Sequence, residues 1–251
     1  MAQIERLQKI IANRGAVSRR AAEKLMLEGK VSVDGQIITE LGYKCDINSL
    51  IEISGKEIIP ETQKYYFLFN KPRLVLTTMK DPKGRETVSD FFKDISARVY
   101  PVGRLDYDVS GLLLMTNDGD FANFVMHPRY EFIKTYQALC RGNVTKKQVS
   151  QLMKGVLIDD DYQTKAIDAK LLNYNKEKNI SIVELTIAEG RKHHVKKMLA
   201  AAEIDLAKLQ RIKIEFLEIG DLQVGEYRSL TPHEIKQFYG IYNSTKRKGD
   251  L

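Results

Sequence analysis

The sequence predicts an α+β protein with a small N-terminal module of helices and strands and a larger domain built on a mixed, mainly antiparallel sheet. Strand-like and helix-like stretches alternate irregularly over 66–240, without the regular strand–helix–strand rhythm of a doubly wound parallel sheet. Pro60 and the polar stretch 61–65 separate this part from the N-terminal module. We therefore expect domains at 1–60 and 66–240, a linker at 61–65 and a basic tail at 241–251.

The composition is that of a globular protein, and its charge favours an acidic partner. Hydrophobic residues make up 43% and charged residues 29% of the 251 residues, so a sizeable core can form. The net charge of +7 favours nucleic acid as the partner, although solvated helix faces would carry the same charge. The basic residues gather in 1–30, 71–85 and 188–213, and clusters on one face can follow a phosphate backbone.

Several classes of protein are disfavoured. Cys45 and Cys140 are the only two cysteines, so we expect neither a disulfide framework nor a cysteine-rich zinc site. No apolar run approaches the roughly 18–20 residues that cross a bilayer, and the N-terminus lacks the apolar core of a secretion signal. We expect a cytoplasmic protein without a membrane segment. Since no exposed apolar repeat demands a dimer, we also expect a monomer.

The first part of the chain predicts two short helices followed by a hairpin. An apolar stripe at helical spacing begins at Ile4, and Gly15 suits the left-handed end of that helix. Ser18 is a good N-cap for the second helix. Asp34-Gly35 lies in the middle of the strand-like stretch 31–38, where this dipeptide is a strong signal for a two-residue hairpin turn.

Basic side chains flank the turn between the two helices. Arg14, Arg19 and Arg20 lie there, which fits either a recognition helix in a DNA major groove or a grip on an RNA backbone. Residues 6–11, 15–25 and 29–35 together resemble an S4-type RNA-binding domain. That resemblance implies structured RNA as the partner, with contacts expected from Arg6, Arg14, Arg19, Arg20 and Lys24.

The larger domain begins with the apolar run Tyr66–Phe69, which Asn70-Lys71-Pro72 closes. From there the pattern predicts eight strands, at 66–69, 74–78, 111–116, 133–141, 167–173, 181–188, 211–219 and 227–230. It predicts four helices, at 87–93, 119–126, 145–153 and 191–202.

Chemistry-bearing side chains gather between Gly103 and Gly119. A loop rich in Gly, Asp and Arg precedes the apolar run 112–116, and sites are often built at the mouth of a buried strand. Asp106 and Asp108 could form a carboxylate pair for general acid–base work. On the pattern alone, the Arg-x-Asp of this loop is more typical of a structural ion pair or a turn.

The stretch from Gly103 to Gly119 resembles the catalytic motif of the ribosomal-type pseudouridine synthases, which share an S4 domain. The family pattern continues at Lys134-Thr135-Tyr136 and at Glu189-Gly190-Arg191-Lys192. Residues 80–85 and 220–231 are most similar to the members that modify large-subunit rRNA, the B type. The resemblance implies no metal and no organic cofactor, because the conversion of uridine to pseudouridine is an isomerisation.

The resemblance also implies roles for individual residues. Asp106 matches the essential carboxylate, which acts as nucleophile or as base at the ribose while uracil is detached from C1′, turned and rejoined through C5. Arg191 is expected to pair with Asp106 and keep it ionised. Tyr136 is expected to stack on the target uracil, although without the motif it would be an ordinary strand tyrosine. Arg104 is expected to fill the space of the extruded base.

One segment departs from the family pattern, which after Gly-Arg usually reads basic–Gln–Val–Arg–Arg. This chain has His193-His194-Val195-Lys196-Lys197, and lysine keeps a charge for phosphate but loses the planar fork of arginine. We expect the two histidines to begin a helix near the RNA and not to bind a metal, since no further ligand lies at suitable spacing. Further RNA contacts are expected from Lys192, Lys196 and Lys197.

Three functions fit these observations. The first is isomerisation of a uridine in large-subunit rRNA, either free or in a pre-ribosomal particle. The second is the same reaction on small-subunit rRNA, and the third is a non-catalytic role in rRNA binding or ribosome assembly. The intact set of Asp106, Tyr136, Arg104 and Arg191 favours an enzyme, because a protein kept only for binding needs no carboxylate beside a phosphate-binding surface.

Overall fold

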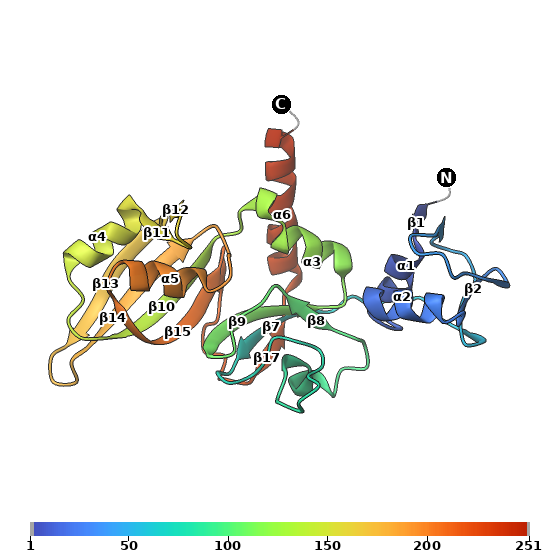
Figure 1. Cartoon of the computed structure of the whole chain (residues 1–251), viewed down its shortest axis with the longest axis horizontal. Helices are drawn as coiled ribbons and strands as arrows, with labels where there is room; N and C mark the ends of the chain where they lie inside the picture. The colour runs from blue at the N-terminus through green and yellow to red at the C-terminus, as the bar shows by residue number, and fades with distance from the viewer. Residues whose placement is uncertain (1–2, 250–251) are drawn as a thin grey trace. The chain divides into compact units, whose positions relative to one another are not determined.

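The computed structural model describes residues 3–249, and side chains only as far as Ser244 (Figure 1). The chain forms two compact units. The first contains the chain up to Tyr65 together with Asp94–Val99 and Thr116–Gly119, and the second contains the remainder. The two inserted segments therefore belong to the first unit although they lie within the stretch expected to form the larger domain.

The first unit packs two helices against short strands. Ser18 caps α2 by accepting a hydrogen bond from the backbone N of Ala21 at 3.2 Å, as the sequence predicts. Asp34 and Gly35 both have positive φ, 49° and 83°, as a two-residue hairpin turn requires. The elements are β1 (Ile4–Arg6), α1 (Leu7–Asn13), α2 (Arg19–Leu27), β2 (Val31–Val33), β3 (Gln36–Ile37), β4 (Lys44–Asp46), β5 (Ile51–Ile53) and β6 (Lys56–Glu57).

The core of the first unit is formed by the apolar stripes of its helices and the inward residues of its strands. Leu7 and Ile11 of α1 and Met26 of α2 are fully buried together with Val31 and Ile51. The expected stripe starts later than the sequence suggests, because the chain enters as strand β1, which pairs with β4.

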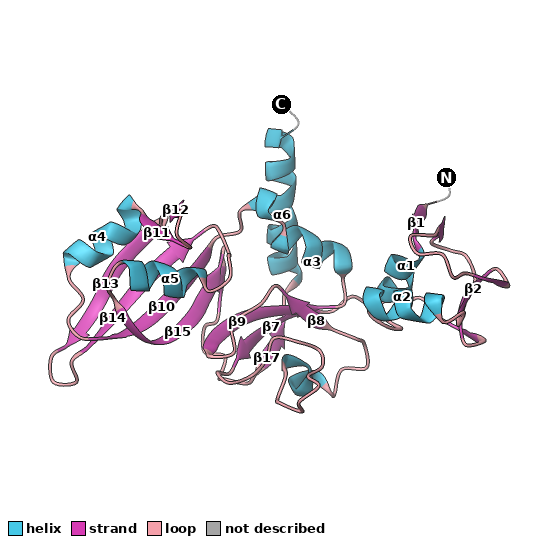
Figure 2. Ribbon diagram, viewed as in Figure 1, coloured by secondary structure: helices cyan, strands magenta, loops and turns pink. Residues whose placement is uncertain are grey.

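The second unit is built on one sheet, whose strands follow the order β13-β14-β10-β15-β9-β7-β17 (Figure 2). In addition, β8 pairs with β9 and β16 with β15. The predicted α+β class with a mainly antiparallel sheet is confirmed. The strands are β7 (Tyr66–Lys71), β8 (Tyr100–Val102), β9 (Val109–Thr116), β10 (Lys134–Arg141), β13 (Asp168–Asn175), β14 (Ile180–Ile187), β15 (Asp205–Ile214), β16 (Leu217–Glu218) and β17 (Tyr227–Ser229), with a separate hairpin of β11 (Val156–Ile158) and β12 (Tyr162–Thr164).

Helices cover the sheet and close its core. Helix α5 packs against β15 and the β11–β12 hairpin, and α4 packs against β13 (Figure 2). Leu68 of β7 and Leu112 of β9 are buried with Phe121 and Phe238, which come from α3 and α6. The helices are α3 (Gly119–Met126), α4 (Lys146–Lys154), α5 (His194–Ala201) and α6 (Pro232–Gly249). Within the described residues, no helix has the length and apolar character needed to span a membrane.

Two expected elements near residue 80 take another form. Residues 74–78 form a loop, because Leu74, two residues after Pro72, adopts a left-handed φ of 63°, and within this stretch only Leu76 makes a bridge, to Thr87. The predicted helix at 87–93 is the 3₁₀-helix Val88–Phe92, which Thr87 begins with a capping box.

Three expected boundaries near the C-terminus also differ. The predicted strand 211–219 begins earlier, at Asp205, and a left-handed Glu215 (φ 52°) separates it from β16. The predicted helix 191–202 begins later, at His194, because His193 is left-handed, with a φ of 56°. The stretch expected as a basic tail continues α6 as far as Gly249, and its last two residues lie outside the described part.

Strands β9 and β15 pair in parallel, whereas β15 pairs antiparallel with β10, β10 with β14, and β14 with β13. Gly111 lies opposite Arg211 in the parallel pair, with a φ of 108°. A Cβ at Gly111 would lie 2.2 Å from the carbonyl oxygen of Arg211, so the two backbones approach too closely for any side chain. This pair joins β13, β14, β10, β15 and β16 to β9, β7, β17 and β8.

Candidate active site

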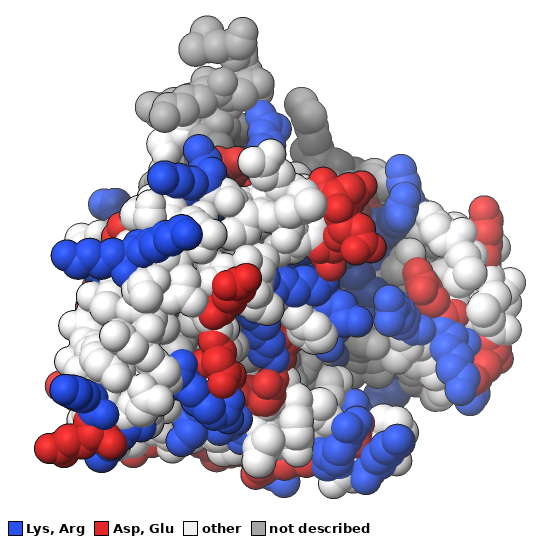
Figure 3. All heavy atoms as spheres, turned by 60° about the vertical axis from the view of Figure 1, so that its left-hand side comes forward, with Lys and Arg blue, Asp and Glu red and all other residues white. Residues whose placement is uncertain are grey.

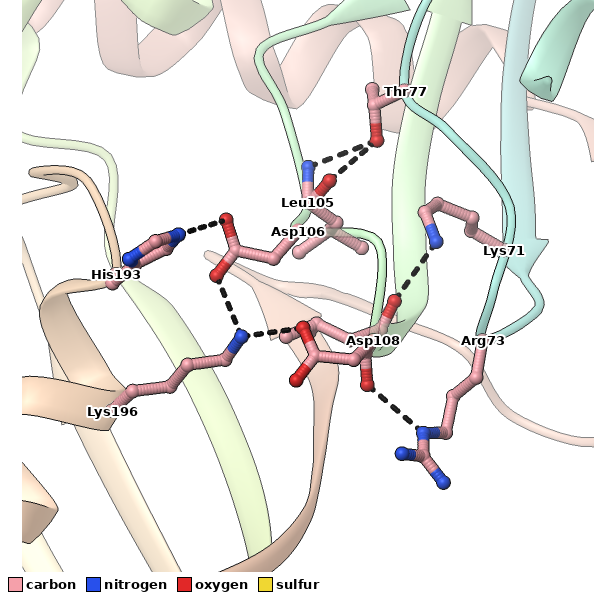
Figure 4. A network of polar contacts seen from close by, with 9 residues as sticks. Lys71, Arg73, Thr77, Leu105, Asp106, Asp108, His193 and Lys196 are labelled. Carbon is pink, nitrogen blue, oxygen red and sulfur yellow. Dashed lines mark hydrogen bonds and ion pairs between the residues drawn. The ribbon is translucent and has the colours of Figure 1, made fainter. Parts of the chain in front are cut away.

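Asp106 lies on the loop between β8 and β9, at the mouth of the buried strand β9 (Figure 4). Its side chain is 31% exposed, so it is open to a substrate but partly shielded from water. Two side chains hold the loop from behind. Thr77 Oγ1 donates to the carbonyl of Leu105 at 2.6 Å, and Arg73 Nε donates to the carbonyl of Asp108 at 2.9 Å. The backbone on both sides of Asp106 is therefore anchored.

A fully buried lysine completes this support. Lys71 Nζ donates to the carbonyls of Val109 at 2.9 Å and of Pro72 at 2.7 Å. Burial lowers the pKa of Lys71 to about 8, while the carboxylates of Asp108 and Asp106 act in the opposite direction. Sequence reasoning missed this residue and Thr77, because nothing in their local patterns shows which backbone their side chains reach.

Lys196 faces Asp106 from the first turns of α5. Its Nζ lies 3.1 Å from Asp106 Oδ2 and 2.5 Å from Asp108 Oδ1, and His193 Nε2 lies 3.7 Å from Asp106 Oδ1 (Figure 4). Burial lowers the pKa of Lys196, but the hydrogen bonds to Asp108 and Asp106 outweigh it, so the pKa lies above its ordinary value. Partial burial raises the pKa of Asp108, but the bond to Lys196 prevails and the pKa is lowered.

Arg191 was expected to pair with Asp106, and this structure shows a different partner for each. The guanidinium carbon of Arg191 lies 3.3 Å from the ring centroid of Tyr162 in β12, in a cation–π contact. The Tyr162 hydroxyl in turn donates to Glu189. His193, with a left-handed φ of 56°, separates Arg191 from α5, and it is Lys196 in the first turn of α5 that faces Asp106.

The two histidines also differ in their environments. His194 is 4% exposed, and its Nδ1 accepts a hydrogen bond from the backbone N of Arg191 while its Nε2 contacts Thr164 Oγ1 at 3.0 Å. Burial lowers the pKa of His194, because the protein interior disfavours the charged form of the ring. His194 begins α5 as expected, but its side chain is a packing group and not a group that faces RNA. His193 is exposed beside Asp106.

The other two residues expected to position the substrate lie on different elements. Arg104 is exposed and precedes Asp106 by two residues on the same loop. Tyr136 is 8% exposed in β10, where its register partners are Leu185 of β14 and Arg211 of β15. No hydrogen bond joins either side chain to Asp106 among the described residues.

The basic residues expected to bind RNA fall into two groups. Arg6, Arg19, Arg20 and Lys192 are exposed, and Lys24 is exposed with a loose ion pair to Glu28 at 3.8 Å. Lys196 and Lys197 are held by carboxylates, those of Asp106 and Asp108 and that of Asp159. Figure 3 shows Lys and Arg interspersed with Asp and Glu on the face it presents, and not one continuous basic field.

Arg14 requires a correction, because it points into the first unit. It is 9% exposed, and its guanidinium donates to the carbonyls of Ile58 at 3.0 Å, Ile47 at 2.7 Å and Ser49 at 2.8 Å. A guanidinium used in this way satisfies buried backbone oxygens and has little left for phosphate. We therefore assign Arg14 to the stability of the unit.

Two family models match the chain. One, described as RNA pseudouridylate synthase, matches residues 65–201, and the other, the S4 domain, matches residues 5–51. The chain belongs to the RNA pseudouridylate synthase family. The expectation of an RNA-modifying enzyme with an S4 domain is thereby confirmed, and RNA is its partner.

Relatives match the pseudouridine synthase over almost its whole length. "Ribosomal large subunit pseudouridine synthase B" of Bacillus subtilis (strain 168) is 46% identical over 243 residues, which is 97% of this chain and 99% of that protein. An "Uncharacterized RNA pseudouridine synthase" of Aquifex aeolicus is 39% identical, covering 93% of each chain. A crystal structure of a pseudouridylate synthase matches with a TM-score of 0.64 and 30% identity, covering 93% of this chain and 99% of that one.

Proposed function

We propose that this pseudouridine synthase isomerises a specific uridine in large-subunit ribosomal RNA, with Asp106 as its essential carboxylate. The observation that carries the role of Asp106 is its ion pair with Lys196 at 3.1 Å, on a loop anchored from behind at the mouth of β9. The choice of the large subunit is supported by the 46% identity to a relative named for that activity. Because ribosomal RNA is the proposed substrate, we propose a cytoplasmic location. We also propose a monomer, because no exposed apolar repeat in the sequence demands a dimer.

The proposed reaction uses the negative charge of Asp106 at the ribose. The N1–C1′ bond breaks, the uracil turns, a C5–C1′ bond forms, and the proton on C5 is lost while N1 gains one. Asp106 acts either as nucleophile at C1′ or as base at the sugar, and both roles require the ionised form. The ammonium of Lys196 favours that form.

Other residues are proposed to bring the uridine to this carboxylate. A base must leave its stack before chemistry on it can occur. Tyr136 is proposed to stack on the uracil, and Arg104 to occupy the place that the base leaves. Arg191, which packs over the ring of Tyr162, is proposed to position the nucleotide. The proposed contacts with the rest of the RNA come from Arg6, Arg19, Arg20, Lys24 and Lys192, with Lys196 and Lys197 near the site.

The substrate is tested by mapping pseudouridine in both ribosomal RNAs. The enzyme is incubated with protein-free large- and small-subunit rRNA, and pseudouridine is located by carbodiimide-dependent stops of reverse transcription. We expect a new stop in large-subunit rRNA. A stop in small-subunit rRNA alone would overturn the proposed substrate. If neither free RNA reacts, pre-ribosomal particles are assayed in the same way, and a lack of stops there would leave the non-catalytic assembly role as the better explanation.

The role of the S4 domain is tested by the salt dependence of RNA binding. We expect Arg19→Ala/Arg20→Ala to weaken binding and to reduce the slope of log affinity against log salt by roughly one unit per lost phosphate contact. The matched control is Lys146→Ala/Lys147→Ala, which removes two exposed charges from the start of α4. If the two double variants had equal slopes of log affinity against log salt, the proposed RNA contacts of Arg19 and Arg20 in the S4 domain would be wrong. Filter binding or fluorescence anisotropy at several salt concentrations measures the slope.

A further inference from the structure

Lys196 forms ion pairs with both Asp106 and Asp108, and Asp108, the nearer of the two, is not the proposed catalytic group. Its Nζ lies 2.5 Å from Asp108 Oδ1 and 3.1 Å from Asp106 Oδ2 (Figure 4). The lysine side chain is 24% exposed, whereas that of Asp108 is 52% exposed. The ammonium of Lys196 therefore lies between the carboxylates of Asp106 and Asp108.

The position of Asp108 is set by the protein. Arg73 holds its carbonyl at 2.9 Å, and Lys71 holds the carbonyl of the next residue, Val109, at 2.9 Å. Because the main chain is held at Asp108 and at Val109, the carboxylate of Asp108 extends from a restrained backbone and offers the flexible side chain of Lys196 a nearby partner. A lysine needs such a partner more than an arginine does, because its ammonium has no rigid fork to lock it on one partner.

Sharing has an electrostatic consequence. A lysine carries one unit of positive charge. When this charge is shared between Asp108 and Asp106, it stabilises the ionised form of Asp106 less than it would if Asp106 were its only partner. The nearby negative charge of Asp108 also repels the negative charge of Asp106, which again makes the ionised form of Asp106 less stable. A carboxylate that is stabilised less is a stronger base and a better nucleophile once it is ionised.

We propose that Asp108 is a positioning residue of the reaction, which fixes Lys196 beside Asp106 and, by taking part of the lysine's charge, keeps Asp106 reactive. This inference rests on the proposed catalytic role of Asp106. Asp108 does not touch the substrate in this scheme and acts only through Lys196.

The test is the pH profile of the single-turnover rate, because a purely structural role would not move it. Asp108→Asn keeps an oxygen for Lys196 but removes the charge, so Asp106 receives the whole ammonium. We expect the acid limb of the rate profile to move to lower pH than in the wild type, with a several-fold lower plateau rate and unchanged RNA affinity. Asp108→Ala also removes the partner that holds Lys196, and we expect a larger loss of the plateau rate.

Other charged groups also lie around Asp106 and could affect the pH profile. They are His193 and Lys196 from α5, Lys71 from β7 and Asp108 from its own loop. Because His193 is titratable, the profiles are repeated with His193→Gln in both backgrounds. Asp161→Asn, at an exposed position of the loop between β11 and β12, makes the same charge change away from Lys196 and is expected to leave the acid limb in place.

The outcomes separate this inference from the function on which it rests. The assay uses whichever RNA the mapping identifies, so an error in the assigned ribosomal subunit does not affect it. A wild-type acid limb and plateau for Asp108→Asn, in a protein that melts as the wild type does, would overturn the role of Asp108 alone. Full activity of Asp106→Asn would instead overturn the role of Asp106, and the inference about Asp108 with it.

Discussion

Replacing Asp106 with asparagine is expected to abolish pseudouridine formation, lowering the single-turnover rate by about 10³-fold or more. The amide has nearly the same shape but can neither act as a nucleophile nor accept a proton as the carboxylate does. RNA affinity is expected to stay close to that of the wild type, because the change removes a negative charge from a surface that meets phosphates. The rate and the affinity are measured on the same RNA.

The control for this variant is Asp108→Asn, which makes the same substitution two residues away and keeps a partner for Lys196. It is expected to lose only a several-fold part of the plateau rate. If Asp106→Asn lost RNA binding while its activity per bound RNA stayed at the wild-type level, the carboxylate would be a binding group and the proposed chemistry would be wrong.

Replacing Gly111 with alanine is expected to destabilise the second unit by about 3 kcal/mol or more, or to prevent folding altogether. The new Cβ would lie 2.2 Å from the carbonyl oxygen of Arg211 and 2.8 Å from its nitrogen, so a strand backbone has to move. The φ of 108° adds strain for any residue with a side chain. The effect is expected to be large because this contact lies in the parallel pairing of β9 with β15, which connects two parts of the sheet.

Gly142→Ala separates the clash from the strain. Gly142 also has a positive φ, 84°, but no atom lies within 4 Å of the place where its Cβ would be. It is expected to cost only about 1 kcal/mol. Urea unfolding of both variants gives the free energy of unfolding. Equal costs at the two positions would contradict the close approach at Gly111.

Elements with strong local signals could be predicted accurately. Ser18 caps α2 and Asp34-Gly35 makes the hairpin because each depends on backbone groups two or three residues away. The loop 103–108 before a buried strand was also predictable, since a Gly-, Asp- and Arg-rich stretch precedes an apolar run. Residues 74–78 were misassigned, because a left-handed Leu74 leaves no mark in an apolar pattern.

The amino-acid pattern was enough to identify the class of fold, the S4-like module, the family and Asp106 as the candidate carboxylate, because each depends on residues close together in the chain. It could not show the partner of Asp106, since Lys196 and Arg191 are both cations on the same segment, and only the folded chain places Lys196 beside Asp106 and Arg191 over the ring of Tyr162. It could not show that Arg14 is buried, because its three carbonyl partners come from later in the chain. Contacts between distant segments depend on how the chain packs, and packing is not encoded in any short stretch of sequence.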